Sequence, residues 1–74
     1  MARLANISGK ETVQAFEKAG WRIVGQPVGS HVVMAKAGKR ANLSVPQHKE
    51  LSVGTLRTLI RYAEMTVQEF LDLL

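Results

Sequence analysis

The chain has 74 residues, of which 46% are hydrophobic and none is cysteine, and its formal net charge is +4. This composition predicts one folded domain over residues 1–74 and excludes disulfides and thiolate zinc sites. No apolar run approaches the roughly 20 residues of a membrane span, and the first eight residues lack the apolar core of a secretory signal. We therefore expect a small cytoplasmic protein that has no membrane partner.

Basic residues are concentrated in the first part of the chain. All ten Lys and Arg lie at or before Arg61, where three acidic residues bring the charge of residues 1–61 to +7, and residues 62–74 carry −3. A basic body of this kind favours a polyanion partner, because cations that contact nucleic acid release the counterions condensed on it. Charge alone does not distinguish RNA from any other polyanion.

The first predicted element is a helix from about Gly9 to Ala19. Ser8-Gly-Lys-Glu11 has the pattern of a capping box, in which the Ser hydroxyl and the Glu carboxylate satisfy free N–H groups at a helix start. Apolar residues then recur at helical spacing, namely Val13, Phe16 and Ala19. Gly20 is placed to end the helix in a left-handed conformation.

Three short runs rich in β-forming residues follow: Trp21–Gln26, Ser30–Ala35 and Arg40–Val45. The first run stops at Pro27-Val28-Gly29. The second ends in Lys36-Ala-Gly-Lys39, which predicts a hairpin turn with Gly38 at a positive φ. Pro46 closes the third run, because proline cannot donate a hydrogen bond to a strand ladder.

A second helix fits residues 53–64, because its apolar residues form one stripe: Leu56, Leu59, Ile60 and Ala63. Thr66-Val-Gln-Glu69 is a second capping box, and it opens a short last helix through Phe70, Leu71 and Leu74. The order is therefore α-β-β-β-α with an extra short α-helix. We expect an α+β fold in which a three-stranded antiparallel sheet has its helices on one face and leaves the other face open.

Two histidines are the residues of chemical interest. The sequence has no phosphate-binding glycine loop, no HExxH pattern, no nucleophile elbow and no acidic pair suited to magnesium, so we expect neither a metal nor a cofactor. Strand alternation places His31 on the opposite face from Val32 and Met34. His48 follows a proline in a polar connection. Each histidine is also compatible with an exposed residue that has no role.

RNA is a substrate for which one histidine is a sufficient starting point. RNA carries its own nucleophile, the 2′-hydroxyl, and an imidazole with a pKa near 6.5 exchanges protons at neutral pH. Lysine or arginine can then stabilise charge on the phosphate without a metal. We expect the RNA contacts to come from polar and basic residues, namely Ser30, Lys36, Lys39, Arg40, His48, Lys49, Arg57 and Arg61. Trp21, by contrast, is predicted to be a core residue that packs on the first helix.

Several short motifs occur in a characteristic order: Gly20-Trp21, Gly29-Ser30-His31, Val45-Pro46-Gln47-His48, Glu50-Leu51, Gly54-Thr55-Leu56-Arg57, Leu59-Ile60, and Thr66 with Glu69-Phe70. At this separation they resemble the HicA (YcfA-like) toxins over nearly the whole chain, from about Ser8 to Leu74. Gly-Ser-His and Gly-Thr-Leu-Arg are the most specific pieces, and it is their combination that is characteristic.

The resemblance implies a fold like that of a double-stranded-RNA-binding domain. It also implies an mRNA interferase, a metal-independent endoribonuclease that acts as the toxin of a toxin–antitoxin system. The expected partners are mRNA and a HicB-type antitoxin that covers the active surface in a hetero-complex. The functional histidine of the family corresponds to His31, which would act as general acid or base.

The chain departs from many relatives at two places. Val32 stands where many carry a second histidine, and the connection from Pro46 to Leu51 is shorter than in many, which leaves the role of His48 open. Two alternatives to a nuclease therefore remain. One is an RNA-binding module of the same fold that does not cut, and the other is an interaction protein whose open sheet face and acidic tail serve only a protein partner.

Overall fold

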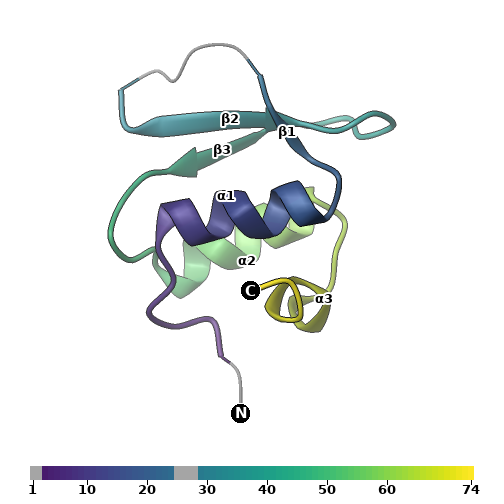
Figure 1. The fold of residues 1–74 in the computed structure, drawn as a ribbon. Coiled ribbons are helices and arrows are strands. Elements are labelled where there is room, and N and C mark those ends of the chain that lie inside the picture. Colours follow the sequence, from purple (N-terminus) through teal and green to yellow (C-terminus); the bar gives the residue numbers. More distant parts are fainter. Residues whose placement is uncertain (1–2, 25–28) are drawn as a thin grey trace.

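The computed structural model describes residues 3–24 and 29–74, and within these ranges the chain forms two layers. Its elements are α1 (Gly9–Lys18), β1 (Arg22–Ile23), β2 (His31–Ala35), β3 (Leu43–Pro46), α2 (Val53–Tyr62) and α3 (Val67–Leu71). The antiparallel sheet has the order β1-β2-β3, and α1 and α2 lie side by side against one face of it (Figure 1). This arrangement confirms the predicted α+β fold, which has the element order of a double-stranded-RNA-binding domain.

Helix α1 begins and ends where the local signals place it. The Ser8 hydroxyl accepts the N–H of Glu11, and the Glu11 carboxylate accepts the N–H of Ser8, each at 3.0 Å. Both bonds satisfy N–H groups that the first helical turn leaves free. The helix ends at Lys18, and Gly20 follows with a φ of 98°, a conformation that costs glycine little. The prediction for this element is confirmed.

Aromatic side chains join the helices at the centre of the core. Trp21 is 3% exposed and meets Phe16 edge to face, with the ring centroids 6.3 Å apart. Phe70 of α3 lies on the same Phe16 ring at 5.2 Å. Burial of three aromatic rings contributes much of the apolar stabilisation available to so small a domain. Trp21 is therefore the core residue that was expected.

The register of the sheet separates its two faces. Met34 pairs with Leu43 and Val32 pairs with Val45, and the side chains of Met34, Leu43 and Val45 are fully buried against the helices. His31 pairs with Pro46, one step out of phase with these residues. Successive side chains on a strand point to opposite faces, so His31 belongs to the face turned away from α1 and α2.

The strands and the last helix are shorter than expected. Strand β1 has two residues, and Trp21 and Val24 on either side of it are not strand. The end of the expected first strand, Gly25 and Gln26, and the expected stop at Pro27-Val28 lie outside the described residues. Strand β3 begins at Leu43, because the chain bends at residues 40–41 as it leaves the hairpin. Helix α3 ends at Leu71, so Leu74 lies beyond it and is 49% exposed, contrary to the expectation.

Helix α2 buries its apolar stripe, namely Leu56, Leu59, Ile60 and Ala63, and ends at Tyr62. Within residues 3–24 and 29–74 no helix is long and apolar enough to cross a membrane.

Candidate active site

His31 is the first residue of β2 and its side chain is exposed on the open face of the sheet. Directly opposite paired residues share a face, so the open face here also carries Pro46 and, two pairs along, Val33 and Ser44. Among residues 3–24 and 29–74, the helices α1, α2 and α3 all lie away from this face of the sheet (Figure 1).

Backbone hydrogen bonds bring a second histidine to the same end of the sheet. The N–H of Gln47 donates to the carbonyl oxygen of Ser30 at 2.6 Å, just beyond the last β2–β3 pair, His31 and Pro46. The N–H of Gly9 donates to the carbonyl oxygen of His48 at 2.9 Å. We call this group the histidine end: Gly9, Ser30, His31, Gln47 and His48. Figure 1 shows that β2 begins, β3 ends and both α1 and α2 begin on this side of the molecule.

A glycine makes the histidine end compact. A Cβ on Gly9 would fall on the carbonyl oxygen of Pro46 and 2.8 Å from the Cα of Gln47. The start of α1 can approach β3 this closely only because residue 9 has no side chain. The polar connection that carries His48 lies outside the sheet, and the close approach of Gly9 holds this connection against the start of α1.

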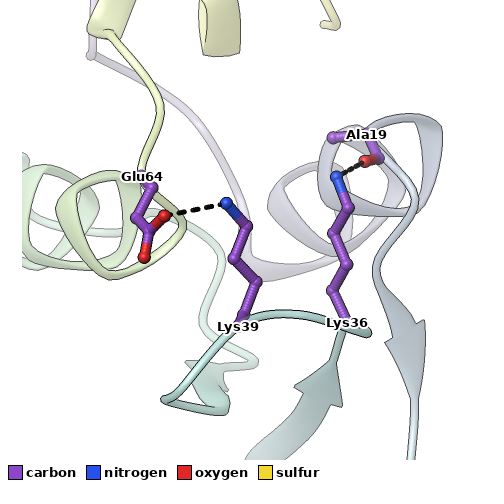
Figure 2. Close-up of polar contacts among 4 residues, drawn as sticks. All are labelled: Ala19, Lys36, Lys39 and Glu64. Atoms are coloured by element: carbon purple, nitrogen blue, oxygen red, sulfur yellow. Dashed lines mark hydrogen bonds and ion pairs between the residues drawn. The ribbon is translucent and has the colours of Figure 1, made fainter.

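Two of the expected RNA contacts are engaged at the opposite end of the molecule. The ammonium group of Lys36 donates to the carbonyl oxygen of Ala19, at the end of α1, at 2.7 Å (Figure 2). Lys39 pairs with Glu64, just beyond α2, at 3.0 Å. Cations at helix C-termini satisfy carbonyl groups and interact favourably with the helix dipole. Both lysines therefore hold the β2–β3 hairpin against the ends of the helices.

The length of β2 separates these lysines from His31. Five residues at about 3.3 Å each put the backbone of Lys36 about 16 Å from that of His31. Arg40 follows on the same hairpin and is exposed. The proximity in sequence that suggested shared phosphate contacts does not become proximity in space.

Arg57 and Arg61 lie in the other layer. Both are exposed, and they line a hollow of about 550 Å³ between α2 and α3, together with Met65 and Val67. The opposite side of α2 packs on the sheet. These arginines therefore face away from His31.

The structure adds one cation to the histidine end that the sequence did not indicate. Lys10 follows Gly9 in the first turn of α1 and is exposed, as is Lys49 after His48. Lys10 precedes His31 by 21 residues, so only the contact between α1 and the β3 connection places it there. Lys49, by contrast, was among the expected contacts and does lie beside the histidine end.

The clearest electrostatic perturbation is at Glu11. The backbone N–H of Ser8, and then its hydroxyl, hold the pKa of this carboxyl below its usual range by hydrogen bonding to the charged form. Among residues 3–24 and 29–74, no three His, Cys, Asp or Glu side chains gather as a metal site would require.

Comparisons with known proteins are consistent with this arrangement. A family model described as the HicA toxin of bacterial toxin–antitoxin systems matches residues 9–65. A similar solved structure is a chain of a toxin–antitoxin complex from Streptococcus pneumoniae, with 30% sequence identity and a TM-score of 0.70. The similarity covers 80% of this chain and 98% of that one. No curated protein sequence matches the chain.

Proposed function

The chain belongs to the HicA family of toxins from bacterial toxin–antitoxin systems, and on that premise we propose that it is a metal-independent endoribonuclease that cuts messenger RNA. The observation that carries the proposal is the position of His31, which is exposed at the start of β2 on the open face of the sheet. In this proposal its imidazole transfers a proton at the scissile phosphate, as general acid or base. Imidazole is suited to that task near neutral pH.

The RNA backbone in this proposal passes over the histidine end. Ser30 and His48 offer polar contacts, and Lys49 and Lys10 offer positive charge beside them. Such contacts position the phosphate and stabilise the charge that develops on it. The engaged lysines at the hairpin are assigned a structural role instead.

The proposed protein partner is a HicB-type antitoxin that covers the open face around His31. Support comes from the similar chain, which was solved in a toxin–antitoxin complex. An antitoxin in this position would exclude RNA from the imidazole.

Inducible expression and a purified RNA assay test the proposed function together. We expect the wild-type protein to arrest growth and to cut RNA in the presence of EDTA, and His31→Ala to lose about 10²- to 10⁴-fold in cleavage rate, the usual contribution of proton transfer. Ser44→Ala is the matched control, because Ser44 is exposed on the same face of the sheet, two residue pairs away from His31. It should cut as the wild type does.

Three results would contradict the proposal. They are a wild-type protein that cuts no RNA, a His31→Ala variant that remains fully toxic, and cleavage that stops with EDTA. RNA binding by a wild-type protein that never cuts would instead support the RNA-binding module.

A further inference from the structure

We propose that His48 is the second proton-transfer group of the site, so that cleavage uses two histidines on opposite sides of the scissile phosphate. The inference rests on the proposed nuclease function and deepens it. A single imidazole leaves either the attacking or the leaving oxygen without a proton-transfer partner. His48, at the same histidine end as His31, is available as that partner.

Alternation continued two residues past the end of β3 at Pro46 would put the His48 side chain on the open face. Gln47 belongs to the helical side, because its side-chain amide donates to the carbonyl oxygen of Val45 at 3.1 Å and lies close to Gly9. The residue after Gln47 therefore points the other way, as Pro46 does before it. His48 is exposed, as this orientation requires.

The register ends at a pair that contains His31 and lies close to His48 in the chain. His31 pairs with Pro46, and His48 is two residues farther along the same chain direction. If the pairing is continued beyond Pro46, residues so related have Cα atoms about 7–8 Å apart, within reach of ring side chains. Two imidazoles at this separation leave room for a phosphate group between them.

Two backbone hydrogen bonds hold the connection that carries His48. The carbonyl oxygen of His48 accepts the N–H of Gly9, and the N–H of Leu51 donates to the carbonyl oxygen of Ile7 at 2.8 Å. The connection is thus bonded to the start of α1 and to the segment before it. A catalytic group needs this kind of support from its surroundings.

The charged groups near the two imidazoles come from the connection after β3 and from the first turn of α1. Lys49 and Glu50 lie on the same connection, and Lys10 and Glu11 lie in the first turn of α1. The Glu11 carboxylate is already bonded to Ser8. Two lysines beside the site favour a bound phosphate.

The reaction balances with these two groups alone. One imidazole takes the proton of the 2′-hydroxyl as the 2′-oxygen forms a bond to phosphorus. The bond from phosphorus to the 5′-oxygen breaks, and the other imidazole, protonated, gives its proton to that oxygen. The products are a 2′,3′-cyclic phosphate and a free 5′-hydroxyl, with no oxidant or cofactor consumed.

The test compares His48→Ala, His48→Gln and His31→Ala on two versions of an RNA cut by the wild-type protein. One version is ordinary RNA, and in the other the 5′-oxygen at the mapped cut site is replaced by sulfur. A sulfur leaving group needs no proton, so it rescues the variant that lacks the general acid. Glu50→Gln, on the same connection, is the matched control and should cut normally.

We expect each His48 variant to lose about 10²- to 10⁴-fold on ordinary RNA and one limb of the pH–rate profile, while its melting temperature stays that of the wild type. The sulfur substrate should rescue the variants at one histidine and not those at the other. The proposal is overturned if His48→Ala and His48→Gln cut within about threefold of wild type, or if sulfur rescues neither position. In either case a His31→Ala variant that is inactive still leaves the proposed function standing, whereas a wild-type protein that cuts no RNA removes both.

Discussion

Glu11 shows how one side chain connects local stability to the candidate site. Its carboxylate accepts the N–H of Ser8 and so helps to define the start of α1. Gly9 follows Ser8, and its N–H donates to the carbonyl oxygen of His48. A group whose pKa is lowered in the folded protein contributes stability above its unfolded pKa. That contribution disappears as the pH falls through the folded pKa.

We therefore predict that Glu11→Gln lowers the melting temperature at pH 7 and that the difference from wild type shrinks as the pH falls below the usual carboxyl range. Gln keeps the hydrogen-bonding shape, so the variant isolates the charge. Circular dichroism across pH measures the effect. Glu17→Gln, exposed on the same helix, is the control and should not lower the melting temperature. A Glu11 deficit that is equal at every pH would refute this account.

The approach of α1 to β3 depends on one glycine, and a second glycine provides the comparison. A Cβ at residue 9 meets the backbone of Pro46 and Gln47, whereas a Cβ at Gly54 in α2 meets nothing within 4 Å. We predict that Gly9→Ala destabilises the fold by about 1–3 kcal/mol, the usual cost of overpacking. Gly54→Ala should stabilise it by up to about 1 kcal/mol, because alanine has the higher helix propensity.

Urea unfolding of the two variants gives both free energies. The same substitution is expected to have opposite signs at the two positions, so a general effect of Gly→Ala cannot produce the result. Equal signs would mean that the contact between residue 9 and β3 is looser than the structure indicates.

Elements with local signals could be predicted from the sequence, and contacts between elements could not. Capping boxes and helical spacing lie within a few residues, so α1 and α2 were placed nearly to their ends. Lys36 bonds to Ala19 across 17 residues and Lys39 to Glu64 across 25, and no local pattern reports either contact. The two lysines were therefore predicted as phosphate contacts on the basis of sequence proximity to His31.

The same contrast applies to the candidate site. Motif position singled out His31 as a candidate, and alternation along β2 predicted which face of the sheet it occupies. The proximity of His48 and Lys10 depends on the bond between Gly9 and the β3 connection, which joins residues 39 positions apart. Such pairings arise only when the sheet and the first helix pack together.

At the scale of the whole molecule, the lysines fall into two groups at opposite ends of the sheet. Lys36 and Lys39 bind the hairpin to the helices at one end, and Lys49 and Lys10 are exposed at the end that carries His31. Each of these lysines contributes one positive charge, so the net charge does not distinguish the two groups. Salt dependence separates them, because only cations that contact phosphates release counterions.

We predict that Lys49→Ala, made in the non-cutting His31→Ala background, lowers the slope of log affinity for single-stranded RNA against log salt by about 0.7, the value for one phosphate contact. Lys36→Ala should leave the slope unchanged and instead cost about 1 kcal/mol of stability, because the Ala19 carbonyl loses its donor. Titrations at several salt concentrations measure the slopes, and urea unfolding measures the stability. If Lys36→Ala lowered the slope as much as Lys49→Ala, the RNA would have to reach the hairpin, about 16 Å from His31, and the separation of the two ends would fail.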